Sequence, residues 1–148
     1  MKIVVKRFNE LSVEEIYQIL KVRADVFIIE QKCIYKDIDG KDEKAMHVMG
    51  KNNNEIIAYT IILDSGECYD FPSISRVVVN KKNRGEERGK EIMKETIKYI
   101  VEELKEKTIV LAAQKYLEKF YRELGFIAEG EEYLEDEIPH QKMILKLL

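Results

Sequence analysis

The feature that most constrains the fold is an apolar strand pattern followed by an amphipathic helix and a second apolar strand. The segment Ser73–Val79 ends in three consecutive valines without polar alternation, which is typical of a strand buried on both faces. Residues 92–104 place apolar side chains at intervals of three and four, as an amphipathic helix does. The segment Thr108–Ala113 is again a strand of the buried type. A strand, a helix and a strand in this order predict an α/β domain.

The remaining segments extend this pattern along the chain. Ser12 and Glu15 fit a capping box, in which each side chain satisfies a free backbone amide of the other, so a helix is predicted to start there. Residues 116–124 predict a short helix that ends at Gly125. Further strands are predicted at Lys2–Arg7, Ala45–Gly50, Glu55–Leu63, from Phe126 onward and at Gln141–Leu147. Because no repeat or linker interrupts these elements, we expect one domain over residues 1–148, built around a mixed sheet.

The composition excludes several classes of protein. Hydrophobic residues make up 45% of the 148 residues and charged residues 36%, which predicts a folded globule rather than a disordered chain. The 25 basic and 28 acidic side chains give a net charge of -3, so we expect no nucleic-acid partner. No apolar run approaches the roughly 20 residues that cross a bilayer, and the first ten residues do not resemble a signal peptide. We therefore expect no membrane association and a cytoplasmic location.

The two cysteines suggest no special chemistry. Cys33 and Cys68 show no CxxC spacing, and no histidine stands near them at the spacing of metal ligands. We therefore expect neither a disulfide framework nor a metal site.

The most informative charge pattern lies between the valine strand and the long helix. Residues 81–90 contain two acids and five bases, a net charge of +3, which leaves -6 on the rest of the chain. Backbone amides at a helix start are unpaired and attract anions, and Gly85 and Gly89 allow a close approach. The segment therefore indicates a site for an anion such as a pyrophosphate, or alternatively a solvated turn. Neither a P-loop nor a GxGxxG motif is present.

These segments resemble a known family. Residues 84–89, which follow the valine strand, are similar to motif A of the GNAT N-acetyltransferases, and residues 120–126 are similar to their motif B. More narrowly, the chain resembles the ElaA-like branch of that superfamily. The matching segments, in order, are RADVFIIEQ (23–31), YKDIDG (35–40), RGEERG (84–89), AQ (113–114), FYRELGF (120–126) and IPH (138–140). The resemblance implies the GNAT fold, an α/β (α+β) fold with a mixed central sheet of about six to seven strands flanked by about four helices.

The resemblance also implies acetyl-CoA as cosubstrate, without a metal. The pantetheine arm is then expected along the strand at Val77, Val78 and Val79. The pyrophosphate is expected on the loop formed by Arg84, Gly85, Glu86, Glu87, Arg88, Gly89 and Lys90, and Gln114 is expected at the cofactor as well. One residue departs from the family pattern, because Glu87 stands where motif A has its first glycine. Its carboxylate repels a pyrophosphate unless the side chain points to solvent.

The activity that the resemblance implies is direct transfer of acetyl to a primary amine of a small molecule or a protein, in a ternary complex. Tyr121 occupies the position of the family's proton donor for the leaving thiolate; its alternative role is a core aromatic. Arg23 and Glu30 are seven residues apart on one apolar helix face, where charges are rarely left unpaired. They form a salt bridge, or Arg23 pairs with Asp37 or Asp39 in the next loop, or Glu30 serves as the base or as a contact to the acceptor.

Other residues are candidates for the acceptor side. Gln31, His47 and His140 are candidate contacts, and either histidine is a candidate base, although a satisfied structural histidine is the commoner case. Residues 129–137 hold six acids and no base, which favours a cationic amine if this turn borders the acceptor groove. We expect a monomer or a homodimer. The alternative function is a non-catalytic module that senses CoA or acyl-CoA, or a protein-interaction domain.

Overall fold

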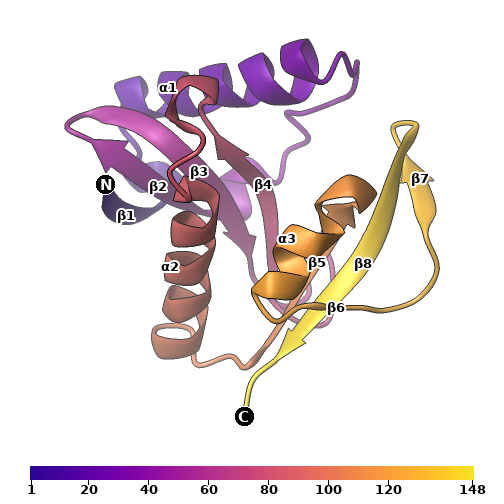
Figure 1. The fold of residues 1–148 in the computed structure, drawn as a ribbon. Helices are drawn as coiled ribbons and strands as arrows, with labels where there is room; N and C mark the ends of the chain where they lie inside the picture. The colour runs from indigo at the N-terminus through magenta and orange to yellow at the C-terminus, as the bar shows by residue number, and fades with distance from the viewer.

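One long sheet organises the chain, with helices on both of its faces (Figure 1). The computed structural model describes all residues, 1–148. The helices are α1 (Val13–Arg23), α2 (Arg88–Glu102) and α3 (Glu118–Glu123). The strands are β1 (Lys2–Arg7), β2 (Met46–Asn52), β3 (Glu55–Leu63), β4 (Ser73–Val79), β5 (Thr108–Gln114), β6 (Ile127–Ala128), β7 (Tyr133–Glu135) and β8 (Ile138–Lys146). Their order in the sheet is β1-β2-β3-β4-β5-β8-β6, and β7 pairs with β8.

The α/β class with a mixed sheet is confirmed, but the element counts differ from the expected ones. The sheet has eight strands because the segment after Gly125 contributes the short strands β6 and β7. Three α-helices are present, and α1 continues into a π-helical segment, Ala24–Glu30. None of these helices is long and apolar enough to cross a membrane.

The sheet is divided at the contact between β4 and β5. These two strands are parallel and share a single paired position, Ser73 with Val110. Every other neighbouring pair of strands is antiparallel, and β5 pairs with β8 over seven positions. From Ile74 to Val79, one edge of β4 therefore has no strand partner, which leaves backbone groups that a ligand can bind. The Val79 carbonyl oxygen is already engaged, because it accepts a hydrogen bond from Nε of Arg84 at 3.3 Å.

The core lies on both faces of the sheet. Adjacent strand residues point to opposite faces, and Val48 and Met49 of β2 accordingly belong to different apolar clusters. On one face the α2 residues Ile92, Met93 and Ile100 are fully buried, and Tyr121 of α3 joins the same cluster. On the other face α1 contributes Ile19 and Val22. This packing fixes the starts of α2 and α3 relative to the free edge of β4.

The predicted capping box at the start of α1 is confirmed. The Ser12 hydroxyl accepts a hydrogen bond from the Glu15 amide at 3.1 Å, and a Glu15 carboxylate oxygen accepts one from the Ser12 amide at 2.8 Å. The same carboxylate is buried and pairs with Lys6 at 2.9 Å and Lys51 at 2.6 Å. It thereby joins α1 to the edge of the sheet.

Glu15→Gln is expected to destabilise the protein by about 2 kcal/mol at neutral pH. Burial alone raises the pKa of Glu15, but the hydrogen bonds from Lys51, Ser12 and Lys6 outweigh it and lower the pKa to about 2. A lowered folded-state pKa stabilises the protein above the ordinary value of 4.5, and this stabilisation is lost as the pH falls towards 2. Urea unfolding of both proteins at a series of pH values measures the effect. A difference in unfolding free energy that stays constant down to the lowest pH contradicts it.

Candidate active site

A cavity of about 330 Å³ opens where β4 and β5 diverge. Its walls come from the segment after the π-helical turn, from β3, β4 and β5, from α3, and from the β7–β8 hairpin. Of the residues predicted to bind the cofactor or the acceptor or to act in catalysis, those that line it are Gln31, Val77, Gln114, Tyr121 and His140. The strand divergence therefore brings together residues that lie far apart in the chain.

The loop that resembles motif A lies directly beyond the end of β4. Helix α2 begins at Arg88, and its N-cap residue, Glu87, makes no side-chain capping bond, so the first amides of the helix are open to a ligand. Gly85 has φ +91, a left-handed conformation that favours glycine. A Cβ at Gly89 lies 3.4 Å from the Phe120 ring and 3.8 Å from Val79, so this glycine keeps α2 close to α3 and β4. The expected anion site thus has the required backbone geometry.

The basic side chains of this loop are paired with carboxylates from other elements. Arg84 forms a bidentate pair with Glu30, with Nη1–Oε2 2.7 Å and Nη2–Oε1 3.0 Å. Lys90 pairs with Glu123 of α3 at 2.9 Å. Two buried side-chain atoms of the protein have no hydrogen-bond partner, Nε of Arg88 and Oδ1 of Asn83, and both belong to this loop. The Arg88 guanidinium pairs with Glu86 at 2.8 Å and its Nε is enclosed, so the open backbone amides at the start of α2 are the groups that fit an anionic ligand such as the pyrophosphate of CoA.

The departure from the family pattern at Glu87 has a structural explanation. Glu87 adopts φ 56 and ψ 26, so the backbone keeps the left-handed conformation for which a glycine is suited. Its side chain is 80% exposed and lies 4.0 Å from the Lys90 ammonium. The carboxylate therefore points to solvent, which is the condition under which it does not oppose a bound pyrophosphate.

Glu87→Gly is expected to stabilise the protein by about 1 kcal/mol, because a residue with a Cβ is strained in the left-handed region. Its effect on CoA binding is expected to be less than about twofold, because the exposed Glu87 carboxylate points away from the anion site and is screened by solvent. Urea unfolding and calorimetric titration with CoA measure the two effects. Glu87→Gln is the matched control, because it removes the charge and keeps the strained backbone. Equal stability of the glycine variant and the wild type contradicts the assignment of strain.

Tyr121 lies between two aromatic rings at the wall of the cavity. Phe120 and Phe126 meet its ring edge to face, at centroid distances of 5.1 Å and 6.1 Å. Its hydroxyl has no hydrogen-bond partner in the protein, yet it is not among the enclosed unpaired atoms, so it is accessible from the cavity. Burial raises the pKa of Tyr121, which keeps the phenol protonated and able to donate.

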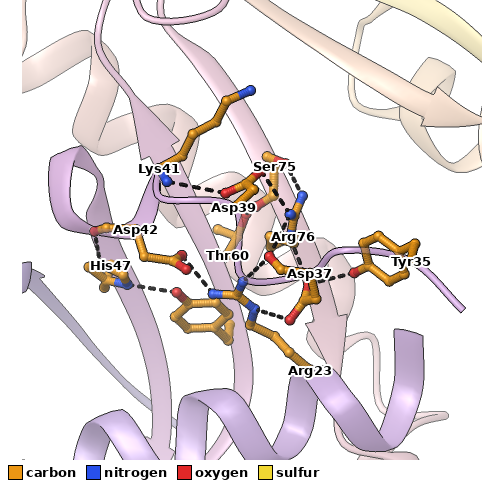
Figure 2. A network of polar contacts seen from close by, with 11 residues as sticks. Arg23, Tyr35, Asp37, Asp39, Lys41, Asp42, His47, Thr60, Ser75 and Arg76 are labelled. Carbon is orange, nitrogen blue, oxygen red and sulfur yellow. Dashed lines mark hydrogen bonds and ion pairs between the residues drawn. The ribbon is translucent and has the colours of Figure 1, made fainter. Parts of the chain in front are cut away.

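Arg23 is held in a buried polar network rather than by Glu30 (Figure 2). Its Nε donates to Asp37 at 3.0 Å, and its Nη1 donates to Asp42 at 2.7 Å. The predicted alternative, a bridge from Arg23 to Asp37, is confirmed, and Arg23 and Glu30 do not pair with each other. Glu30 lies at the protein surface against Arg84, which lowers the pKa of Glu30 and keeps it ionised.

The same network holds an irregular residue of β4 that the sequence did not reveal. Arg76 has φ 57 within the strand, and the pairing with β3 shifts register between Tyr59 and Ile61. Its guanidinium donates to the Asp37 carboxylate and to the Asp37 carbonyl oxygen, both at 2.9 Å. Burial alone raises the pKa of Asp37, but the bond from Tyr35 and the two guanidinium groups outweigh it and hold that pKa below its ordinary value. The network thus fixes the bulge that lies within the free edge of β4.

The two histidines occupy different environments. His47 has both ring nitrogens engaged, Nδ1 with the Tyr59 hydroxyl at 2.6 Å and Nε2 with the Asp42 carbonyl oxygen at 2.9 Å. It belongs to the network of Figure 2 and does not line the cavity. His140 lines the cavity and has Nδ1 2.7 Å from the Ile138 carbonyl oxygen.

The two glutamines lie at the cavity and bind each other. Their side-chain amides form reciprocal hydrogen bonds between Gln31 and Gln114, at 3.3 Å and 3.2 Å. These bonds connect the end of the π-helical segment with the end of β5. The pair therefore closes one side of the cavity.

Comparison with known proteins shows the family to which the chain belongs. The family model described as an acetyltransferase (GNAT) domain matches residues 9–147. The protein ElaA of Escherichia coli is 39% identical over 142 residues, which cover 95% of this chain and 93% of that protein. A UPF0039 protein of Schizosaccharomyces pombe is 38% identical over 149 residues, covering 99% and 98% of the two chains.

Two solved structures extend this likeness to the fold. The crystal structure of Escherichia coli ElaA is 38% identical, with a TM-score of 0.90 over 99% of this chain and 100% of that chain. An acyl-CoA N-acyltransferase from Pseudomonas aeruginosa is 32% identical, also with a TM-score of 0.90, over 98% and 99% of the two chains. The chain therefore belongs to the acetyltransferase (GNAT) family, in its ElaA-like branch.

Proposed function

We propose that this protein is an acetyl-CoA-dependent N-acetyltransferase that moves acetyl directly onto a primary amine. The observation that carries the proposal is the joining of three features: the open amides of α2, the free edge of β4, and a cavity that Tyr121 faces. A thioester of CoA requires all three: the amides for its pyrophosphate, the strand edge for its pantetheine arm, and the cavity for its thioester group. The likeness to the acyl-CoA N-acyltransferase of Pseudomonas aeruginosa supports the same class of reaction.

The binding mode follows from the described contacts. The backbone amides between Arg84 and Lys90 would hold the pyrophosphate. The pantetheine amides would pair with free backbone groups between Val77 and Val79, as an added strand does. The thioester then reaches the cavity, where Val77 and Tyr121 both form part of the wall.

Acyl transfer needs a hydrogen-bond donor for the carbonyl oxygen of the thioester and a proton donor for its sulfur. The amine nitrogen attacks the thioester carbonyl, and a backbone N–H at or near Val77 stabilises the developing oxyanion. The carbon–sulfur bond breaks, the electron pair remains on sulfur, and the Tyr121 hydroxyl donates its proton to the thiolate. The route is direct because neither cysteine has a histidine partner: Cys33 lies 3.8 Å from the Asp136 carbonyl oxygen, and Cys68 lies 3.2 Å from the Lys41 ammonium.

The acceptor that the cavity favours is a cationic primary amine. Glu135 and Asp136, from the acidic turn, line the cavity together with Asp39 and Asp42. The cavity wall also holds the basic residues Lys36, Lys41 and Arg76. Asp39 pairs with Arg76 and Asp42 pairs with Arg23, so Glu135 and Asp136 are the carboxylates that remain for an acceptor. An ammonium group is therefore attracted to the side of the cavity that the β7–β8 hairpin forms, and this attraction weakens with salt.

Thiol release from acetyl-CoA tests the proposal. The panel contains spermidine, a lysine-containing peptide and an aromatic amine that is neutral at pH 7. The proposal predicts thiol release that depends on an alkylamine, is faster than with the neutral amine, and slows with added salt. Binding of CoA without thiol release with any amine supports the non-catalytic sensor instead. Equal rates with charged and neutral amines, at low and high salt, contradict the assignment of a cationic acceptor.

A further inference from the structure

The hydrogen bond of His140 fixes which ring nitrogen carries the proton. Nδ1 lies 2.7 Å from the Ile138 carbonyl oxygen, and a carbonyl oxygen only accepts hydrogen bonds. Nδ1 therefore carries hydrogen in the neutral ring, and the lone pair resides on Nε2. This is the arrangement in which one histidine nitrogen is oriented by the backbone and the other is left free to act as a base.

The free nitrogen, Nε2, belongs to a buried ring that packs against an aromatic side chain at the cavity. His140 is 8% exposed, and its ring stacks on Tyr133 with a centroid distance of 5.9 Å and an interplanar angle of 26°. The nearest charged atom is a carboxylate oxygen of Glu135, which lies 3.5 Å from Nε2. When Nε2 takes up a proton, this contact becomes an ion pair that stabilises the imidazolium.

The other candidate bases are engaged elsewhere. His47 uses both ring nitrogens in hydrogen bonds and does not line the cavity. Glu30 accepts two hydrogen bonds from Arg84 and does not line the cavity either. Of the three, His140 alone presents an unshared basic atom to the site where Tyr121 also lies.

We propose that His140 is the general base of the reaction and removes a proton from the acceptor ammonium through Nε2. The inference rests on the proposed function and adds the acceptor half of its chemistry. The neutral amine then attacks the thioester carbonyl, the electron pair of the carbon–sulfur bond goes to sulfur, and Tyr121 protonates it. The second proton lost by the nitrogen as the amide forms restores Tyr121, and the proton on His140 leaves to solvent.

The charged groups around the ring define its pH response. Glu135 and Tyr133 face it from β7, and the acidic turn adds Asp136 to the cavity wall. The titratable groups that reach the cavity from the other walls include Cys33, Asp39, Lys41, Tyr69 and Tyr121. An unperturbed imidazole is the side chain whose charge changes between pH 5 and 8, which makes the pH dependence of the rate a test for a histidine base.

The variant His140→Asn tests the proposal, because the asparagine amide can still donate to the Ile138 carbonyl oxygen but offers no basic nitrogen. With the amines of the panel, kcat/KM is expected to fall roughly 10²-fold, and its rise through the neutral pH range is expected to disappear. CoA affinity, measured by calorimetry, is expected to stay unchanged. Lys146→Gln, at the exposed end of the same strand and outside the cavity wall, is the control and keeps the wild-type rate and pH profile.

Failure of the inference is distinguishable from failure of the proposed function. An active wild type with an equally active His140→Asn variant, or with a loss that is the same at every pH, overturns the assignment of the base and leaves the acetyltransferase in place. A wild type that releases no thiol with any amine overturns both. Nitrogen NMR of the imidazole gives a readout without catalysis: the neutral ring is expected as the Nδ1–H form, and the Nε2–H form overturns the proposal.

Discussion

Replacing Tyr121 with Phe is expected to lower kcat by about 10²- to 10³-fold while CoA affinity stays the same. The Phe ring keeps the edge-to-face contacts with Phe120 and Phe126, so the packing of α3 is preserved. The missing hydroxyl leaves the thiolate without its proton donor at the moment the carbon–sulfur bond breaks. Steady-state kinetics with acetyl-CoA and an alkylamine, together with calorimetric titration of CoA, separate the two quantities.

The control for this substitution is Tyr99→Phe on α2, which also removes one hydroxyl but lies outside the cavity. It is expected to retain the wild-type kcat. A Tyr121→Phe enzyme that keeps its full rate contradicts the role of proton donor and leaves Tyr121 as a core aromatic. A variant that loses CoA affinity as strongly as kcat points to a binding role instead.

Replacing Asp37 with Asn is expected to cost about 3–5 kcal/mol of unfolding free energy. The Asp37 carboxylate is buried between the guanidinium groups of Arg23 and Arg76 and also accepts from the Tyr35 hydroxyl. When Asp37 is neutral, the guanidinium groups of Arg23 and Arg76 remain in a poorly solvated position. Each then has one ion-pair partner left, Asp42 for Arg23 and Asp39 for Arg76. Urea unfolding followed by circular dichroism measures the loss.

Activity is expected to fall together with this stability, because the same carboxylate holds the bulge at Arg76 in β4. The matched control is Asp25→Asn, which breaks an exposed ion pair with Lys21 within α1 and its π-helical extension. Exposed pairs of this kind contribute about 0.5 kcal/mol or less. An Asp37→Asn protein within about 1 kcal/mol of the wild type contradicts the view that the network anchors the site.

The parts of the fold that the sequence predicted are those fixed by local periodicity. The strand at Ser73–Val79 has the predicted bounds, and so does the first strand at Lys2–Arg7. The amphipathic stripe of α2 faces the core as expected. Gly125, which has a left-handed conformation, follows the end of α3 as predicted. Alternation, helical spacing and capping depend on neighbours within a few residues, which explains why they are readable from the chain.

The parts that were missed depend on contacts between distant segments. Besides its predicted partner Arg23, Asp37 binds Arg76, which lies 39 positions away, and no local pattern predicts that second contact. The positive φ of Arg76 is unexpected for a residue with a long side chain, and only this network makes it tenable. The sequence of the basic loop likewise shows an excess of positive charge, because Glu30, which pairs with Arg84, and Glu123, which pairs with Lys90, come from other elements.

A crystal structure with bound CoA is the most direct test of the central claim, that the start of α2 holds the diphosphate while the thiol end enters the cavity. We predict pyrophosphate oxygens within hydrogen-bonding distance of the amides between residues 84 and 90, and the sulfur beside the Tyr121 hydroxyl. A ligand bound anywhere else on the sheet, or a thiol directed away from Tyr121, contradicts this claim.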